Sequence, residues 1–176
     1  FATQEMRAQS VQPTLSPSMD IQVSSNFERL LFEMNNRDGA LTSSQLGRFR
    51  SEGGFAVSPE QYNTWLAPVF RAARCDDATT LEVIRDVFEK TGQLIDPHTA
   101  VGMFGARQHQ SADIPMVTLA TAHAAKFPDA VEKATGSRPS LPAHLADLFD
   151  HEEYVTAVEN DLEAVQNAVA RFTAGA

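Results

Sequence analysis

Hydrophobic residues recur at helical spacing in several stretches of this chain. One stretch begins after Ser25, which with Glu28 has the pattern of a capping box, and it ends before Asp38. A second follows Asp77, which we expect to cap it, and it ends at Gly92. The pattern therefore predicts a helix in each of these two stretches.

The same signals predict further helices. They cover residues 41–51, 59–72, 97 onward, about 124–134 and 161 to about 172. Asp96 is the expected cap of the third of these, with Pro97 in its first turn. Asn160 and Glu163 have the capping pattern at the start of the last one.

Short apolar runs between the helices are typical of strands. They are residues 20–23 ("DIQV"), a brief run before Asp96, 115–121 ("PMVTLAT") and 154–158 ("YVTAV"). Strands alternating with helices indicate an α/β fold, here helix-rich and with an incomplete sheet of few strands flanked by helices. We expect the missing strands to precede Phe1, so that residues 1–176 form part of a larger domain.

Composition narrows the class of protein. The chain has 176 residues, of which 43% are hydrophobic, and a formal net charge of −9, which argues against a nucleic-acid or anionic-membrane surface. No apolar run approaches the roughly 20 residues needed to cross a bilayer, and no signal peptide is recognisable. The single cysteine, Cys75, fits a reducing compartment, and we expect a soluble, cytoplasmic protein.

Two basic side chains are candidates for chemistry. Lys126 lies close to His123 and would be a Schiff-base nucleophile if it were desolvated, but a solvated surface lysine is the alternative. His98 lies in the first turn of its helix, where backbone donors favour a bound phosphate or carboxylate. Asp96, as the cap, is the competing occupant of those donors.

Other candidates have weaker support. Residues 150–153 ("DHEE") are consecutive and cannot all face one ion on a helix, so we expect no metal site there. We interpret Cys75 as an unreactive filler. No glycine-rich phosphate loop and no GxSxG motif is present.

Thr121 is the polar residue at the end of the best predicted strand. In open α/β sheets, ligands bind beyond the carboxyl ends of the strands, so its hydroxyl is placed to contact one. The alternative is a hydroxyl that bonds its own backbone.

Three segments together resemble the C-terminal part of threonine synthase. They are residues 14–33 ("TLSPSMDIQVSSNFERLLFE"), 94–102 ("LIDPHTAVG") and 118–136 ("TLATAHAAKFPDAVEKATG"). The resemblance implies a fold-type II pyridoxal 5'-phosphate enzyme of the tryptophan-synthase-β-like fold, with residues 1–176 in its large domain. Such enzymes convert O-phospho-L-homoserine and water to L-threonine and phosphate.

The resemblance also implies a role for Thr121. In that family the threonine of the "TAHPAKF" motif bonds the pyridine nitrogen of the cofactor, and Thr121 is the matching residue. This chain has Ala124 where the family usually has proline. A hydroxyl is neutral at working pH, so it cannot hold the ring nitrogen protonated by an ion pair, and the ring is then a milder electron sink.

The family's Schiff-base lysine and cofactor-phosphate loop are expected upstream of Phe1, in the missing N-terminal part of the same chain. We therefore predict no catalytic residue in this chain, and an isolated fragment that is inactive. The alternatives are another enzyme of the same fold, such as a threonine dehydratase or an inactive paralogue, and a helical binding module without cofactor. The roles of His98, His123 and residues 16–21 stay open.

Overall fold

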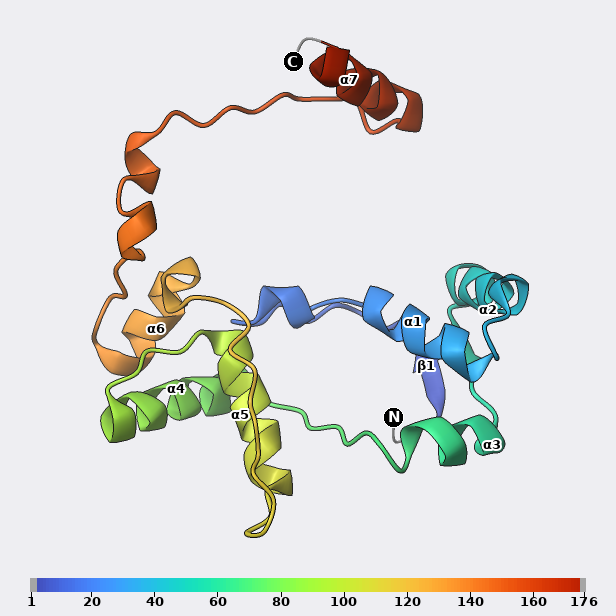
Figure 1. Cartoon of the computed structure of the whole chain (residues 1–176), viewed down its shortest axis with the longest axis horizontal. Helices are drawn as coiled ribbons and strands as arrows, with labels where there is room; N and C mark the ends of the chain where they lie inside the picture. Colours follow the sequence, from blue (N-terminus) through green and yellow to red (C-terminus); the bar gives the residue numbers. More distant parts are fainter. Residues whose placement is uncertain (1–2, 175–176) are drawn as a thin grey trace. The chain divides into compact units, whose positions relative to one another are not determined.

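The computed structural model describes residues 3–174, which are mostly helical (Figure 1). The elements follow one another as β1 (Glu5–Arg7), η1 (Pro17–Met19), α1 (Ser25–Met34), α2 (Gly39–Glu52), β2 (Gly54–Ala56), α3 (Pro59–Gln61), η2 (Tyr62–Leu66), α4 (Asp77–Thr91), α5 (Pro97–His109), η3 (Ala124–Lys126), α6 (Pro128–Thr135), η4 (Ala143–Leu145), η5 (Leu148–Asp150) and α7 (Leu162–Ala174). The chain divides after Ser140 into two units.

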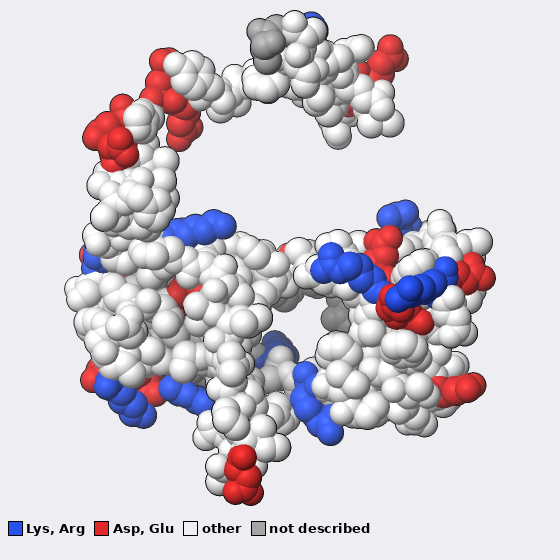
Figure 2. Space-filling model, viewed as in Figure 1, with Lys and Arg blue, Asp and Glu red and all other residues white. Residues whose placement is uncertain are grey.

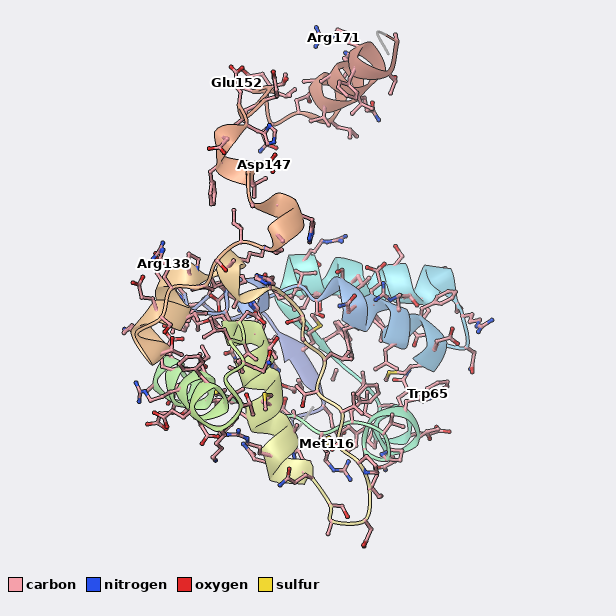
Figure 3. All side chains as sticks on the ribbon, turned by 60° about the vertical axis from the view of Figure 1, so that its left-hand side comes forward. Trp65, Met116, Arg138, Asp147, Glu152 and Arg171 are labelled. Carbon is pink, nitrogen blue, oxygen red and sulfur yellow. The ribbon has the colours of Figure 1, made fainter. Side chains whose placement is uncertain are left out.

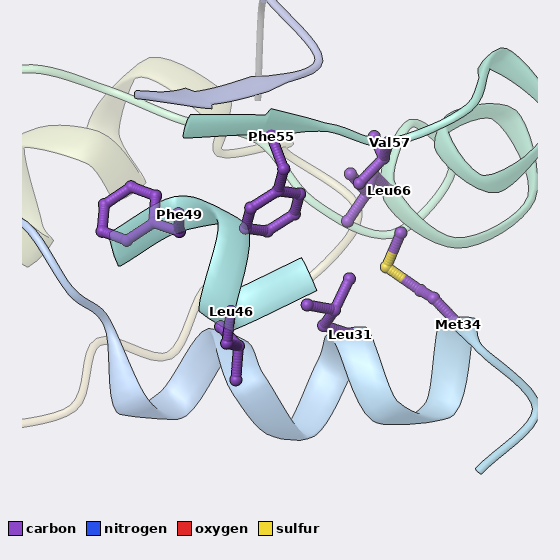
Figure 4. Close-up of a cluster of buried hydrophobic side chains, with 7 residues drawn as sticks. All are labelled: Leu31, Met34, Leu46, Phe49, Phe55, Val57 and Leu66. Atoms are coloured by element: carbon purple, nitrogen blue, oxygen red, sulfur yellow. The ribbon is translucent and has the colours of Figure 1, made fainter. Parts of the chain in front are cut away.

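The first core of the larger unit lies between α1, α2, β2 and η2. Its buried side chains are Leu31, Met34, Leu46, Phe49, Phe55, Val57 and Leu66 (Figure 4). The rings of Phe49 and Phe55 meet edge to face, with centroids 6.4 Å apart. Burying such a side chain stabilises the folded state by about 1.5–3 kcal/mol.

Strands β1 and β2 pair antiparallel beside this core, with Met6 opposite Phe55 and Arg7 opposite Gly54. A Cβ atom at Gly54 would lie 2.7 Å from the Met6 carbonyl oxygen. The close approach of the two strands therefore requires glycine at this position.

The second core joins α4, α5 and α6. Val83, Ile84 and Val87 of α4 are buried together with Ala100 of α5 and Ala134 of α6. The apolar spacing predicts a buried stripe of Leu81, Ile84, Val87 and Phe88 on α4. Ile84 and Val87 are buried as expected, Leu81 and Phe88 are half-buried, and Val83 is buried although it was not predicted. Gly92 has a left-handed backbone, with φ of 72°, and ends α4 as expected.

The helix starts differ from the predictions by one residue in three places. The residue preceding α1 is Ser24, without a side-chain cap, so the predicted capping box at Ser25 is wrong. Asp76, not Asp77, accepts from the Thr79 amide, at 2.9 Å. Before α7, Asp161 and not Asn160 accepts from an amide, that of Ala164, at 2.9 Å.

None of the predicted strands forms in the part of the chain that the structure describes. The predicted strand at residues 115–121 is extended but has no strand partner, and Val117 and Leu119 are 78% and 76% exposed. This extended segment, which includes Met116, lies beside α5 (Figure 3). Residues 20–23, 94–95 and 154–158 are not strands either, because a strand needs a hydrogen-bonding partner along its length.

The smaller unit contains η4, η5 and α7. Acidic side chains gather around η5 (Figure 2), and they include Asp147 and Glu152 (Figure 3). No helix among residues 3–174 is long and apolar enough to span a bilayer.

Candidate cofactor-contacting site

Thr121 is the last residue of the extended segment 115–121, shortly before η3. Its backbone amide donates to Thr99 Oγ1 of helix α5, at 3.1 Å. Its side chain is exposed, and its hydroxyl makes no hydrogen bond to any of residues 3–174. The expected alternative, a hydroxyl bonded to its own backbone, is therefore not observed, and the hydroxyl is available to a ligand.

The turn that follows is held by His123. Its Nδ1 accepts from the amide of Ala125 at 3.1 Å, and its carbonyl oxygen accepts from the amide of Lys126 at 3.0 Å. Lys126 is exposed, and its ammonium group lies 5.9 Å from the centre of the Phe127 ring. An exposed ammonium group is not desolvated, so the geometry supports the surface interpretation of Lys126 and not a nucleophile.

Asp96 organises the first turn of α5 from a position with no exposed surface. One carboxylate oxygen, Oδ2, accepts from the amide of His98 at 3.0 Å and from His98 Nδ1 at 2.8 Å. The other, Oδ1, accepts from the amide of Thr99 at 3.2 Å and from the Thr99 hydroxyl. We call Asp96, His98 and Thr99 the Asp96 cluster.

The ionised form of Asp96 is favoured in this cluster. Burial disfavours the charge and raises the pKa of Asp96, but the hydrogen bonds from Thr99 and His98 outweigh burial and hold the pKa below its ordinary value. The same bonds decide between the two interpretations of this helix terminus. The donors at His98 and Thr99 are occupied by the Asp96 cap and are not open to a phosphate or carboxylate.

His98 is buried, and both of its ring nitrogens have partners. The backbone amide of Ser18 can only donate, and it lies 3.2 Å from His98 Nε2. Nε2 is therefore the acceptor, and Nδ1 carries the proton that faces Asp96. The ring also packs against Phe127, with centroids 4.7 Å apart. His98 is thus a neutral connector between α5, the Ser18 turn and the start of α6.

The turn at Ser18 is closed by Asp20. Its carboxylate accepts from the amide of Thr14 at 2.7 Å and from the Thr14 hydroxyl at 2.8 Å. The amide of Leu15 donates to Asp77 Oδ1 of α4 at 3.0 Å. Residues 21–23 follow this turn and form no strand, and Gln22 Oε1 accepts from the amide of Gln9 at 2.7 Å.

The remaining candidates are separate from this place. Within residues 3–174 no three His, Cys, Asp or Glu side chains are placed to hold a metal ion. His151 pairs with Asp147 at 3.1 Å on an exposed surface. The Cys75 thiol lies 3.4 Å from the Thr80 hydroxyl and is partly buried.

The predicted contact of Thr121 with a pyridine nitrogen needs an open hydroxyl on a peptide that is held in place. The hydroxyl is exposed and unpartnered among the described residues, while the peptide that carries it is tied to α5. The contribution of Thr99 to this arrangement was not predicted. No spacing rule relates positions 99 and 121, and the only signal in the sequence was the polar "DPHT" start of α5.

Comparisons with known proteins match this chain to the C-terminal part of threonine synthases. The family model for threonine synthase, C-terminal, matches residues 99–169. Threonine synthase from Pseudomonas aeruginosa is 47% identical over 164 residues, which are 92% of this chain and 35% of that protein. Threonine synthase from Corynebacterium glutamicum is 34% identical, over 96% of this chain and 36% of that protein. The chain spans about a third of the length of these curated relatives.

Solved structures give the same result for the fold. The crystal structure of PLP-bound threonine synthase from Brucella melitensis has a TM-score of 0.83 at 43% identity, over 97% of this chain and 36% of that chain. The crystal structure of the yeast enzyme has a TM-score of 0.78 at 31% identity, over 98% of this chain and 39% of that chain. The predicted helix-rich α/β class is confirmed.

Proposed function

Since the chain is homologous to the C-terminal part of threonine synthase, as its three motifs predicted, we propose that it acts as that part of a pyridoxal-phosphate-dependent threonine synthase. The reaction is the conversion of O-phospho-L-homoserine and water to L-threonine and phosphate. In class, the whole enzyme is a carbon–oxygen lyase acting on phosphates. Residues 1–176 belong to its large domain, and the site of action is the cytoplasm.

Thr121 is the residue that contacts the cofactor in this proposal. Its hydroxyl bonds the pyridine nitrogen and, being neutral at working pH, does not fix a proton there. Pyridoxal phosphate, when bound, supplies the electron sink for elimination and replacement at the β and γ carbons of the substrate. The observation that carries the assignment is the exposed hydroxyl of Thr121, which has no partner among residues 3–174.

The remainder of the proposed enzyme supplies the Schiff-base lysine, the cofactor-phosphate loop and the strands that pair with residues 115–121. Three facts support this division. The chain spans about a third of its relatives, its extended segment has no strand partner within residues 3–174, and Lys126 is exposed. None of the three lysines matches the family's Schiff-base motif, so no catalytic residue is assigned to this chain.

The proposal is tested with the full-length protein that contains this chain. We expect it to release phosphate from O-phospho-L-homoserine and to form L-threonine. Deamination of threonine without that activity would instead identify a threonine dehydratase-like enzyme. An absence of bound cofactor together with an absence of both activities would point to the helical binding module and reject the proposal.

Thr121→Val tests the residue assignment. Loss of one hydrogen bond of about 0.5–1.5 kcal/mol weakens cofactor binding by up to roughly tenfold, and the absorbance of the bound cofactor shifts. Thr121→Ser keeps the hydroxyl and is expected to retain both properties. An unchanged spectrum and rate in Thr121→Val, with the fold intact by circular dichroism, would reject the role of Thr121.

A further inference from the structure

The extended segment 115–121 is tied to the rest of the chain at one point. Among residues 3–174, the bond from the Thr121 amide to Thr99 Oγ1 is the only hydrogen bond that this segment makes. The segment also lies close to α5 at Thr118. A Cβ atom at Gly102 would lie 3.5 Å from the Thr118 methyl group, which is ordinary van der Waals contact. Within residues 3–174, Thr99 is therefore the residue that holds the Thr121 peptide by a hydrogen bond.

Asp96 fixes the direction of the bond from Thr99. A hydroxyl has one proton, and that of Thr99 is given to Asp96 Oδ1. The remaining lone pairs of Thr99 Oγ1 are left to accept, and the Thr121 amide fills one of them at 3.1 Å. Because Asp96 is fully buried and also accepts from His98, the Thr99 hydroxyl cannot turn without leaving a buried group unpaired.

We propose that Thr99 is a positioning residue, which, oriented by Asp96, holds the Thr121 peptide so that the Thr121 hydroxyl meets the pyridine nitrogen. The inference rests on the proposed contact between Thr121 and the cofactor and extends it to a residue that does not touch the cofactor. His98 joins the same carboxylate to the Ser18 amide, at 3.2 Å. One buried charge thus orders two segments that are far apart in the sequence.

The test compares three variants of the full-length protein. Thr99→Val removes the acceptor while keeping the shape of the side chain, and Thr99→Ser restores it. Thr135→Val is the matched control, because the Thr135 hydroxyl also accepts from a backbone amide, that of Ser137 at 3.1 Å, and donates to a carbonyl, that of Val131 at 2.8 Å. Thr135 belongs to α6 and forms no hydrogen bond with the Asp96 cluster.

Two readouts separate positioning from general stability. In the protein without cofactor, hydrogen exchange of the Thr121 amide is expected to be at least tenfold faster in Thr99→Val, and unchanged in Thr99→Ser and Thr135→Val. In the protein with cofactor, Thr99→Val is expected to shift the absorbance in the same direction as Thr121→Val and to lower kcat/KM by about tenfold. Because Thr99 acts through Thr121, the double variant loses no more than Thr121→Val alone.

Each outcome either supports or rejects the positioning role of Thr99. If Thr121→Val changes the spectrum and Thr99→Val does not, the positioning role is rejected and the proposed function stands. If Thr121→Val itself has no effect, the cofactor contact fails and the positioning role fails with it. Additive losses in the double variant also reject positioning through Thr121. Should Thr99→Val fail to fold, Thr99→Ala removes the hydroxyl without placing a methyl group against the Asp96 carboxylate, and it is measured in the same way.

Discussion

At the scale of single residues, the ionisation of Asp96 is linked to folding. In the unfolded chain the Asp96 carboxylate is hydrated by water, whereas in the folded protein it accepts from four fixed donors. Burial opposes the charge, but these donors outweigh it and hold the pKa of Asp96 below its ordinary value. A carboxyl group with a lowered pKa stabilises the folded state fully at pH values above its ordinary pKa. Its contribution falls as the pH drops toward the lowered value.

Asp96→Asn is expected to lower the free energy of unfolding at neutral pH by about 1–3 kcal/mol, because the amide places two protons toward donors that need acceptors. The variant should also lose less stability between neutral and acidic pH than the parent protein does, since one linked group is gone. Urea unfolding across this pH range measures both. Asp113→Asn, at an exposed carboxylate, is the control. Equal acid sensitivity of the Asp96 variant and the parent would contradict the linkage.

The helix caps show how far the role of a single residue can be predicted from the sequence. Asp96 was predicted correctly because Pro97 marks the first turn and leaves one candidate. At Asp76 and Asp77, two neighbours have the same capping chemistry, and the sequence alone does not separate them. In the structure the Asp76 carboxylate accepts from the Thr79 amide, whereas the Asp77 carboxylate accepts from the Leu15 amide, a tertiary contact that spacing along the helix does not reveal.

At the scale of elements, α4, α5 and α6 depend on one another. Ile84 of α4 and Val131 of α6 have no exposed surface, and Arg85 of α4 donates to the Ala134 carbonyl of α6 at 3.0 Å. The apolar spacing of α4 predicted this helix and its buried face well. The partners of that face could not be predicted, because periodicity gives the direction of burial and not the identity of the neighbour.

Ile84→Ala is expected to lower the free energy of unfolding by about 2–5 kcal/mol, since it removes buried methyl groups and leaves a cavity between α4 and its neighbours. Glu89→Ala, on the exposed face of the same helix, should change it by less than about 0.5 kcal/mol. Urea unfolding of both variants at neutral pH makes the comparison. Similar losses in both would show that α4 is not held by this core.

The strands were the weakest part of the sequence-based prediction, for a reason that belongs to this scale. Helix α5 satisfies its own backbone, so its sequence nearly suffices to predict it. Residues 115–121 have the apolar composition of a strand, yet strand hydrogen bonds come from another segment. Strands β1 and β2 were missed because each has only three residues, which are too few for an alternating pattern to stand out in the sequence.

At the scale of the whole molecule, apolar side chains remain uncovered within residues 3–174. Val117 and Leu119 of the extended segment are examples, and Leu162 and Phe172 of α7 are 72% and 82% exposed. Exposed apolar groups of this kind indicate surfaces that contact other protein. This agrees with a chain that spans about a third of the relatives it matches.

Hydrogen exchange tests the completion of the sheet in the proposed enzyme. In the full-length protein, the amides of residues 116–120 are expected to be protected as strongly as those of α4, because new strand partners accept from them. In the separate 176-residue chain the same amides should exchange rapidly, and that chain should release no phosphate from O-phospho-L-homoserine. Rapid exchange at 116–120 in the full-length protein would contradict strand pairing.

The Asp96 cluster also limits how this region can change in evolution. Its donors and acceptors match one to one, from the Ser18 amide through His98 and Asp96 to Thr99 and the Thr121 amide. A single replacement that removes a donor or an acceptor leaves one partner unmatched in a buried place, whereas a coordinated replacement of two or more positions does not. Single neutral steps in the Asp96 cluster are thereby confined to replacements that keep the same donor or acceptor, such as Thr99→Ser, and a lineage that makes any other change there has to change the partner residue as well.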